Sequence, residues 1–541
     1  MAGWFSASNA RGIDDILWSC ISTLLLCVWT AVHPNIQLDS SEKRRFTSRL
    51  GLMIFAVVFP EILIAAAWRQ RSLAEKLSAR IVKLTIGNPE PRDVSSSPMI
   101  SGNVRSEAGS TTGTGEMMPR PGAATDGATP LMVEEKDTHQ VSNWSSSQGF
   151  FVVMGGLSVR LRHENSDGVL QDHEYSFTPA GVELLAMADG LPAVTKEDVE
   201  ERSNADVIAK IIVLCQVTWF ALQVLSRLIK RLPVTALETH TTVHVGCAIM
   251  MYLFWFNKPY NVSRAILLID AISREIGALL VFRKLWAESY DERLRQHEKK
   301  SERYWQERVI NESQNIMVLD PPPALPVREP LDQAIERYLA TISVESVDSN
   351  PQEKVLQTLS KDAKSGWQRL TTRYDSSIVR LVLDKTCLSG IKQTADNFEI
   401  RTVWGSWSKD VGHGWSKEKL MNMTFNVVYG AAHLTAWNAS SFPTSAERWI
   451  WRISGLILAA VPVWAGLWIV WWKASTSNNK WLFIFRNGDM DIIGGPFFCV
   501  VIVAYTLARC YFLVEALVSL RHLPAGAYRQ VDWSKLFPHT T

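Results

Sequence analysis

Long apolar runs recur along this chain, separated by stretches rich in charged residues. Runs of on the order of 20 apolar residues can cross the hydrocarbon core of a bilayer, whereas a soluble domain interrupts them with polar residues at helical or strand period. We therefore expect an all-α fold, a multi-pass transmembrane helix bundle of about eight spans. The expected spans are residues 13–33, 50–68, 207–225, 234–256, 263–282, 420–437, 449–471 and 495–520.

Three polar regions interrupt this pattern. Residues 87–147 are rich in Ser, Thr, Gly and Pro and carry too little apolar sequence to form a core, which predicts a disordered loop. In the region 148–206, the apolar piece 150–161 is too short to span and is expected to be interfacial or re-entrant, followed by surface helices. Residues 286–419 are charged and contain a proline-rich joint, which predicts a small polar helical cap.

The domain organisation follows from these breaks. Residues 1–86 hold the first two spans, 207–285 the next three, and 420–541 the last three with a C-terminal tail. Basic residues follow almost every span, so the positive-inside rule does not choose an orientation. We expect a multi-pass protein of the endoplasmic reticulum membrane, surrounded by lipid.

Composition narrows the class of function. The chain has 541 residues, a net charge of +2 and 22 tryptophans. A balanced charge gives no support to nucleic-acid binding. Most tryptophans near the spans lie at helix ends, where an aromatic belt explains them. Three lie deeper and are candidates for lining a substrate pocket, with lipid-facing or core packing as the alternative: Trp219, Trp464 and Trp468.

Glu61 is the first candidate for chemistry. It follows Pro60 near the middle of the second apolar run, where a charged side chain costs roughly 3 kcal/mol or more. Proline inside a helix frees a backbone carbonyl and opens local room. Because desolvation disfavours the anion, we expect a neutral carboxyl group suited to donating a proton. The alternative is a neutral carboxyl that hydrogen-bonds a neighbouring helix.

The fifth expected span contains a cluster of charges. Asp270 and Arg274 are four residues apart, close enough for an ion pair that shares the cost of burial, and Glu275 points to an adjacent face. Asp270 and Glu275 are therefore further candidate acids, and Arg274 a candidate substrate contact. If the segment is interfacial, all three side chains are solvated.

The fourth span opens with Glu238, another candidate acid, and then presents His240 and His244 one helical turn apart. Such a pair can hold a metal only with a third ligand, and the sequence offers no cluster typical of membrane di-iron enzymes. We expect no metal, and interpret the two histidines as the rim of a polar pocket or as structural residues. Near the C-terminus, His433 and Glu515 are expected to face a shared interior, with Glu515 alternatively bonding across helices.

Several short stretches resemble a filamentous-fungal family of multi-pass membrane proteins that includes integral-membrane terpene cyclases of meroterpenoid pathways. They are residues 14–20 (DDILWSC), Pro60-Glu61, Lys258-Pro259, 435–438 (TAWN), 447–452 (ERWIWR), 508–524 and Pro538-His539. The resemblance covers the membrane segments and the tail but not residues 87–147, and it carries no residue roles.

The resemblance implies an enzyme that closes a prenyl chain attached to an aromatic or cyclohexenone head. Such a cyclase needs a protonating acid and aromatic walls for the cation, but no cofactor. The aspartate-rich DDxxD motif of metal-dependent terpene synthases is absent. The expected function is therefore protonation of a terminal epoxide or alkene of a farnesylated substrate, an isomerase or lyase reaction, with Glu61 as the acid and Asp270 or Glu238 as the next candidates.

Two other classes remain open. A transporter also needs charges within the membrane, although its internal repeats are not evident in this chain. A non-catalytic scaffold or sensor would use the polar regions and keep the buried acids for packing.

Overall fold

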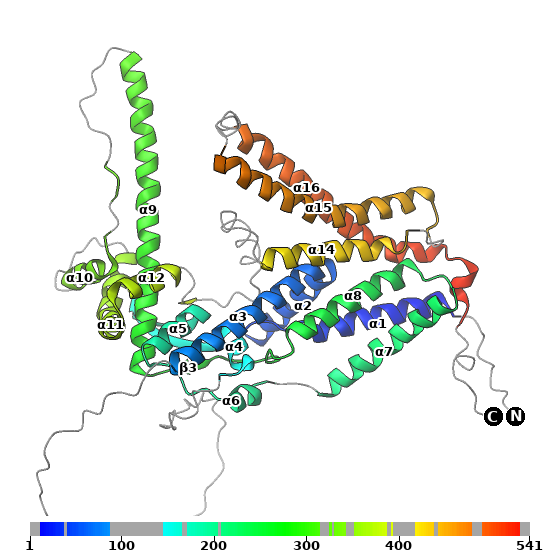
Figure 1. Cartoon of the computed structure of the whole chain (residues 1–541), viewed down its shortest axis with the longest axis horizontal. Helices are drawn as coiled ribbons and strands as arrows, with labels where there is room; N and C mark the ends of the chain where they lie inside the picture. Colours follow the sequence, from blue (N-terminus) through cyan, green and yellow to red (C-terminus); the bar gives the residue numbers. More distant parts are fainter. Residues whose placement is uncertain are drawn as a thin grey trace, which may run out of the picture.

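The computed structural model describes residues 11–36, 41–86, 144–164, 170–203, 207–313, 324–326, 329–341, 351–386, 391–392, 417–437, 442–478 and 489–530. The segment expected to be a disordered loop, 87–147, lies outside them except for its last four residues. Figure 1 shows a helical bundle beside a smaller part that contains a sheet, from which one long helix projects. The chain is mostly helical, as expected.

Eight helices make up the bundle: α1 (Ile13–Ala31), α2 (Glu42–Val58), α3 (Pro60–Ile86), α7 (Val207–Ile229), α8 (Ala236–Phe254), α14 (Lys417–Leu434), α15 (Ser445–Asn478) and α16 (Asp489–Val518). In Figure 1, α1, α3, α7 and α8 lie side by side, with α14 above them and the α15–α16 pair crossing at the top. Two short 3₁₀ helices, η4 (Ser519–Arg521) and η5 (Ala525–Tyr528), follow α16.

The expectation of about eight spans is not supported. Among the described residues, three helical segments are long and apolar enough to cross a membrane, namely 13–31, 211–229 and 500–521. The bent pair α2–α3 makes a fourth candidate, as a broken span or a re-entrant loop. The expected span 234–256 does form helix α8, but its Glu, His and Thr side chains face the bundle interior and lower its hydropathy.

The expectation of an all-α fold is wrong, because the chain contains a four-stranded sheet of order β3-β1-β2-β4. Its strands are β1 (Leu157–Glu164), β2 (Leu170–Phe177), β3 (Ile266–Leu268) and β4 (Ile391–Lys392). The antiparallel pair β1–β2 places Val159 opposite Tyr175, while β3 runs parallel to β1. Val159 and Leu161 are buried and Arg160 is exposed, so this alternation marks a half-buried strand rather than a re-entrant membrane segment.

Short helices surround this sheet. They are α4 (Ser146–Val153), α5 (Pro179–Met187) and α6 (Lys196–Glu201). Of the two expected surface helices, α6 is confirmed, with Thr195 and Asp198 forming its capping box, whereas α5 is mostly buried in the core. Gly149 on α4 lies so close to α3 that a Cβ there would meet the Ala74 carbonyl oxygen at 2.5 Å. The sheet-containing part is thereby packed tightly against the bundle.

The expectation that residues 263–282 form a fifth span is wrong. This segment contains β3 and the start of α9 (Ala271–Ser313), the long helix that projects in Figure 1. Arg274 pairs with Asp362 at 3.4 Å and Glu275 with Arg369 at 2.9 Å, both partners lying on α11 (Pro351–Arg373). These charges hold two packed helices together at the protein surface. The apolar residues of 263–282 resembled a span because one face of α9 is buried against the sheet.

Asp270 does not join these ion pairs but caps the start of α9. Its Oδ2 accepts a hydrogen bond from the Ser273 backbone N–H at 2.8 Å, which satisfies a free donor at the start of α9. Its side chain is exposed. With α10 (Leu331–Thr341), α11 and α12 (Ser376–Thr386) gathered around α9, the expected helical cap is present, but it covers the sheet.

Cysteine labelling tests this correction. In a background without native cysteines and in open membrane fragments, Arg274→Cys should react readily with a charged maleimide. Leu214→Cys, on the candidate span α7 at a position 67% exposed in the structure, should react roughly tenfold or more slowly, because lipid keeps its thiol protonated and excludes the reagent. Equal labelling rates at the two positions would contradict the assignment of 263–282 to the surface.

Candidate functional site

A break between two helices positions the first candidate residue. Helix α2 ends at Val58 and α3 begins at Pro60, and their axes meet at 114°. Proline at the first position of a helix is favourable, but it lacks the N–H that would continue the ladder of α2. The expected kink is therefore a complete break. Glu61 lies in the first turn of α3, where the positive end of the helix dipole favours a negative charge.

Glu61 is fully buried and forms an ion pair with Arg509 on α16. Arg509 Nη2 lies 2.8 Å from Glu61 Oε1, and the arginine is 3% exposed. The solitary carboxyl group expected from the sequence therefore has a cationic partner. Pairing offsets the cost of burying either charge, which the sequence could not show because the two residues are 448 positions apart.

Tyr505 and Asn426 extend this pair into a network. Arg509 Nη2 also donates to the Tyr505 hydroxyl oxygen at 2.8 Å, and that hydroxyl in turn lies 2.6 Å from Asn426 Oδ1 and 3.3 Å from Glu61 Oε1. One hydroxyl proton serves one acceptor at a time, and the shorter distance favours Asn426. Tyr505 is therefore a hydroxyl whose oxygen is polarised by a cation. Sequence reasoning missed both residues, and no pattern distinguished them.

Aromatic rings enclose the same network. The Arg509 guanidinium carbon lies 3.9 Å from the centre of the Tyr429 ring. Behind Tyr429, His433 is stacked on Phe512 and tilted against Trp451, and Trp451 meets Phe512 edge-to-face, with ring centroids 4.4 to 5.9 Å apart. These buried rings come from α14, α15 and α16.

The three predicted histidines lie together beside the network. His433 Nδ1 lies 2.9 Å from the Tyr429 carbonyl oxygen and must donate to it, so its Nε2 is free to accept. His240 Nδ1 lies 3.2 Å from that Nε2 and is therefore the donor. The remaining nitrogen, His240 Nε2, must then be an acceptor. The sequence left a pocket rim and a structural role open for His240 and His244, and their burial in the interior favours the structural role.

His244 stabilises the helix break. Its Nε2 lies 2.8 Å from the carbonyl oxygen of Val57 and its Nδ1 lies 3.0 Å from that of His240. In an unbroken helix the Val57 carbonyl would accept from the N–H of residue 61. The break removes that partner, and His244 supplies another.

Several buried atoms of the cluster have no hydrogen-bond partner among the residues that the structure describes. They are Glu61 Oε2, Arg509 Nε and Nη1, and His240 Nε2. Buried polar atoms are normally satisfied, so exceptions call for an explanation such as a bound water or ligand. We call Glu61, Arg509, Tyr505, Asn426, Tyr429, His240 and His433 the polar core.

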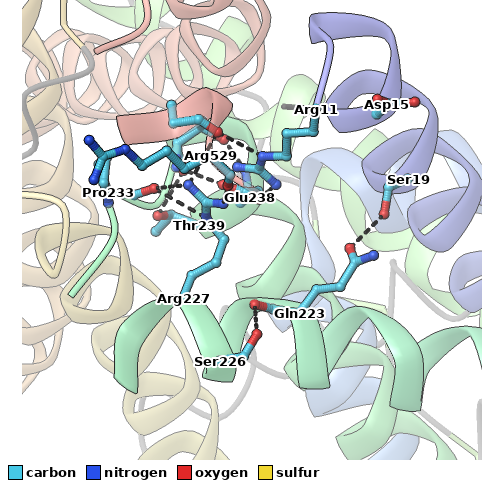
Figure 2. A network of polar contacts seen from close by, with 12 residues as sticks. Arg11, Asp15, Ser19, Gln223, Ser226, Arg227, Pro233, Glu238, Thr239 and Arg529 are labelled. Carbon is cyan, nitrogen blue, oxygen red and sulfur yellow. Dashed lines mark hydrogen bonds and ion pairs between the residues drawn. The ribbon is translucent and has the colours of Figure 1, made fainter. Parts of the chain in front are cut away.

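Glu238 lies outside the polar core and has a structural role. Its Oε2 accepts from the Thr235 backbone N–H at 2.9 Å in a capping box, and its Oε1 pairs with Arg11 at 2.6 Å. Figure 2 shows this network, in which Arg227 and Arg11 reach the backbone of the C-terminal segment. Arg227 donates to carbonyl oxygens of Gly526, Ala527 and Arg529. This network fastens both ends of the described chain to α7 and α8.

The other residues predicted from the sequence do not belong to the polar core. Glu515 is buried on α16, where it contacts Tyr511 and lies near Glu447 rather than His433. Trp219 is 50% exposed on α7, so its ring faces outward. Trp464 is partly buried on α15, and Trp468 lies outside the residues whose side chains are described. In the described part of the chain, no three His, Cys, Asp or Glu side chains are grouped as metal ligands.

Comparison with known proteins gives one match. A model of a family of unknown function (DUF8562) matches residues 1–291 and 417–540. No curated protein and no solved structure matches the chain. All residues of the polar core lie inside the matched ranges, whereas the projecting half of α9 and helices α10 to α12 lie outside them.

Proposed function

The chain belongs to this family of unknown function, and we propose that it is a cofactor-independent membrane enzyme that moves protons on a lipophilic prenylated substrate, in the manner of a terpene cyclase. The observation that carries the proposal is the buried Glu61–Arg509 pair at the α2–α3 break, together with its unpartnered oxygen and nitrogen atoms. An ionised side chain within membrane-spanning sequence is a functional candidate by default.

A cyclisation through carbocations is balanced in protons. One proton opens an epoxide or adds to an alkene, and the last cation loses a proton to a base, so the mass of the substrate does not change. We assign the accepting step to Glu61, as the carboxylate partner of Arg509, because its Oε2 has no hydrogen-bond partner among the described residues. This reverses the direction of proton transfer inferred from the sequence.

Tyr505 fits the donating step. Its oxygen accepts a hydrogen bond from Arg509, so a cation would lie beside the phenolate that forms when the proton is transferred. A phenol with an ordinary pKa of about 10 is still a much weaker acid than a carboxylic acid. The preferred substrate is therefore a terminal epoxide, whose strained ring opens with a weaker acid, rather than an unactivated alkene. The rings of Tyr429, Trp451 and Phe512 would stabilise the cation by roughly 0.5 to 2 kcal/mol each.

Membranes containing the protein provide the test. Incubation with farnesylated phenols, with and without a terminal epoxide, should yield cyclic isomers of unchanged mass from the epoxide. Glu61→Gln keeps an acceptor for Arg509 but cannot take up a proton, and should lower product formation roughly 100-fold or more at normal abundance. Glu75→Gln is the matched control, since Glu75 is an exposed glutamate on the same helix that pairs with Arg71.

Two results would end the proposal. One is a product that gains oxygen or requires an added cofactor. The other is full activity of Glu61→Gln.

A proton-coupled transporter is the second candidate, and the helix break favours it. Transporters often bind charged ligands at the ends of discontinuous helices, as the start of α3 would allow. Uptake that changes in Glu61→Gln without formation of any product from the prenylated phenols would support the transporter.

A further inference from the structure

A pocket of about 440 Å³ lies at the C-terminal end of α8, between α6 and the loop 255–260. One of its residues, His33, follows the end of α1, and another, Ser203, precedes the start of α7. Both helices contain candidate spans. The pocket therefore lies where the chain leaves the membrane, on the side of the sheet (Figure 1).

Aromatic rings form one wall of this pocket. The His33 ring contacts three others, with centroids 6.0 Å from Tyr252, 5.6 Å from Trp255 and 5.0 Å from Tyr260. Two of these contacts are edge-to-face. Tyr260 is fixed further by Arg49, which hydrogen-bonds its hydroxyl and lies 5.2 Å from its ring centre. Fixed rings around an open volume favour a flat ring as ligand.

The floor of the pocket is held by Lys258, which is buried. Its Nζ donates to the His33 carbonyl at 2.6 Å and to Asn35 Oδ1 and Gln70 Oε1 at 3.0 Å each. Gln70 Oε1 also accepts from the Trp255 indole at 2.9 Å. These bonds join α3 to the segments after α1 and α8. The pocket is thus shaped before any ligand arrives, which reduces the entropy cost of binding.

Polar side chains complete the lining of the pocket. They are Ser147, Lys196, Glu200 and Ser203; Lys196 pairs with Glu200 at 3.3 Å, and the Ser203 hydroxyl oxygen accepts a hydrogen bond from the Tyr260 backbone N–H at 2.9 Å. Hydroxyl and charged groups beside aromatic rings match a ring that carries a polar substituent.

An apolar strip leads away from the pocket along α8. Phe256, which lines the pocket just after the end of α8, is 80% exposed, and the exposed side chains of Leu253 and Ile249 lie one helical turn apart on α8 itself. In a membrane this strip faces lipid. A hydrocarbon chain attached to a ring in the pocket can lie along it.

We propose that this pocket binds the ring of an amphiphile whose hydrocarbon chain lies in the membrane along α8. The prenyl character of that chain rests on the proposed function, whereas the ring and its polar substituent rest on the pocket itself. The pocket is then the place where such a substrate first binds, before it reaches the polar core. All of its lining residues lie within residues 1–291, the first range that matches the family.

Equilibrium binding to the purified full-length protein in lipid nanodiscs tests the proposal. A radiolabelled farnesylated phenol should bind, and farnesol, which lacks the ring, should compete roughly tenfold or more weakly. Phospholipid added in excess should not compete. Equal competition by farnesol, or displacement by phospholipid, would overturn the proposal and indicate a general lipid site.

Two variants locate the binding. Glu200→Trp places a bulky ring in the pocket from the exposed face of α6 and should abolish binding. Phe256→Ser changes an exposed side chain, so it leaves folding undisturbed and should weaken binding about threefold to tenfold through loss of apolar contact. Phe46→Ser, at another exposed phenylalanine on α2, is the matched control and should bind normally. Unchanged binding in Phe256→Ser would also overturn the proposal.

The binding assay separates this inference from the proposed function. Glu61→Gln should bind the phenol normally while failing to convert it. Ring-selective binding without any product would support the pocket proposal and contradict the proposed enzymatic function. Product formation that neither pocket variant affects would support the enzymatic function and contradict the pocket proposal.

Discussion

Arg509→Leu is expected to lower the free energy of unfolding by about 3–5 kcal/mol, because it leaves the Glu61 carboxylate buried without its cation. The neighbouring Tyr505 and Asn426 would lose a donor that organises them. Unfolding of the purified protein by increasing denaturing detergent measures the change. We expect the native fold to be lost at a clearly lower detergent fraction than in the unmodified protein.

The double variant Glu61→Leu with Arg509→Leu is the informative companion. Removing both charges removes the desolvation cost along with the attraction, so stability should return to within about 1–2 kcal/mol of the native value. Activity or transport should stay absent. If the two substitutions destabilise additively, they do not interact, and the ion pair is not what holds α3 against α16.

Gly430→Val is expected to destabilise the protein by about 1–3 kcal/mol and to abolish function as well. A Cβ at Gly430 would meet the backbone nitrogen of Ala459 at 2.6 Å, so α14 and α15 would have to separate. Close approach of helix backbones at small residues is a common packing mode in membranes. Because Gly430 is adjacent to Tyr429 and one turn before His433, separation would also displace the polar core.

Gly246→Val on α8 is the matched control. A Cβ there meets nothing within 4 Å, so the same substitution should change stability by less than about 0.5 kcal/mol. Thermal unfolding and product formation, measured on both variants, show whether the close α14–α15 contact at Gly430 causes the loss. Comparable losses at positions 246 and 430 would show that a general effect of the larger side chain, rather than the α14–α15 contact, causes the loss.

Only some residues of the candidate site could be predicted from the sequence. Glu61 stood out because an acid in an apolar run is costly, and the pair His240 and His244 stood out by helical spacing. Arg509, Tyr505 and Asn426 did not, because each is an ordinary residue within its own helix. Their importance arises from contacts between α3, α14 and α16 that no local pattern encodes.

The misread segments have a common physical cause. An apolar stretch that is buried by protein resembles one that is buried by lipid, since both avoid water. Residues 263–282 are apolar because β3 and the start of α9 pack in the core of the sheet-containing part. Residues 150–161 are apolar for the same reason, and their strand period was the available signal.

The sequence by itself determined where most of the apolar helices form, that some of them are apolar enough for a membrane, and that an acid at position 61 is costly to bury. These properties depend on the local order of apolar and polar residues and on the cost of removing charge from water. Only the tertiary structure decided which apolar stretches are buried by protein, that the chain bends by 114° at the break before Pro60, and that Arg509 pairs with Glu61. The burial and the pairing depend on contacts between residues far apart in the sequence, which no local pattern encodes.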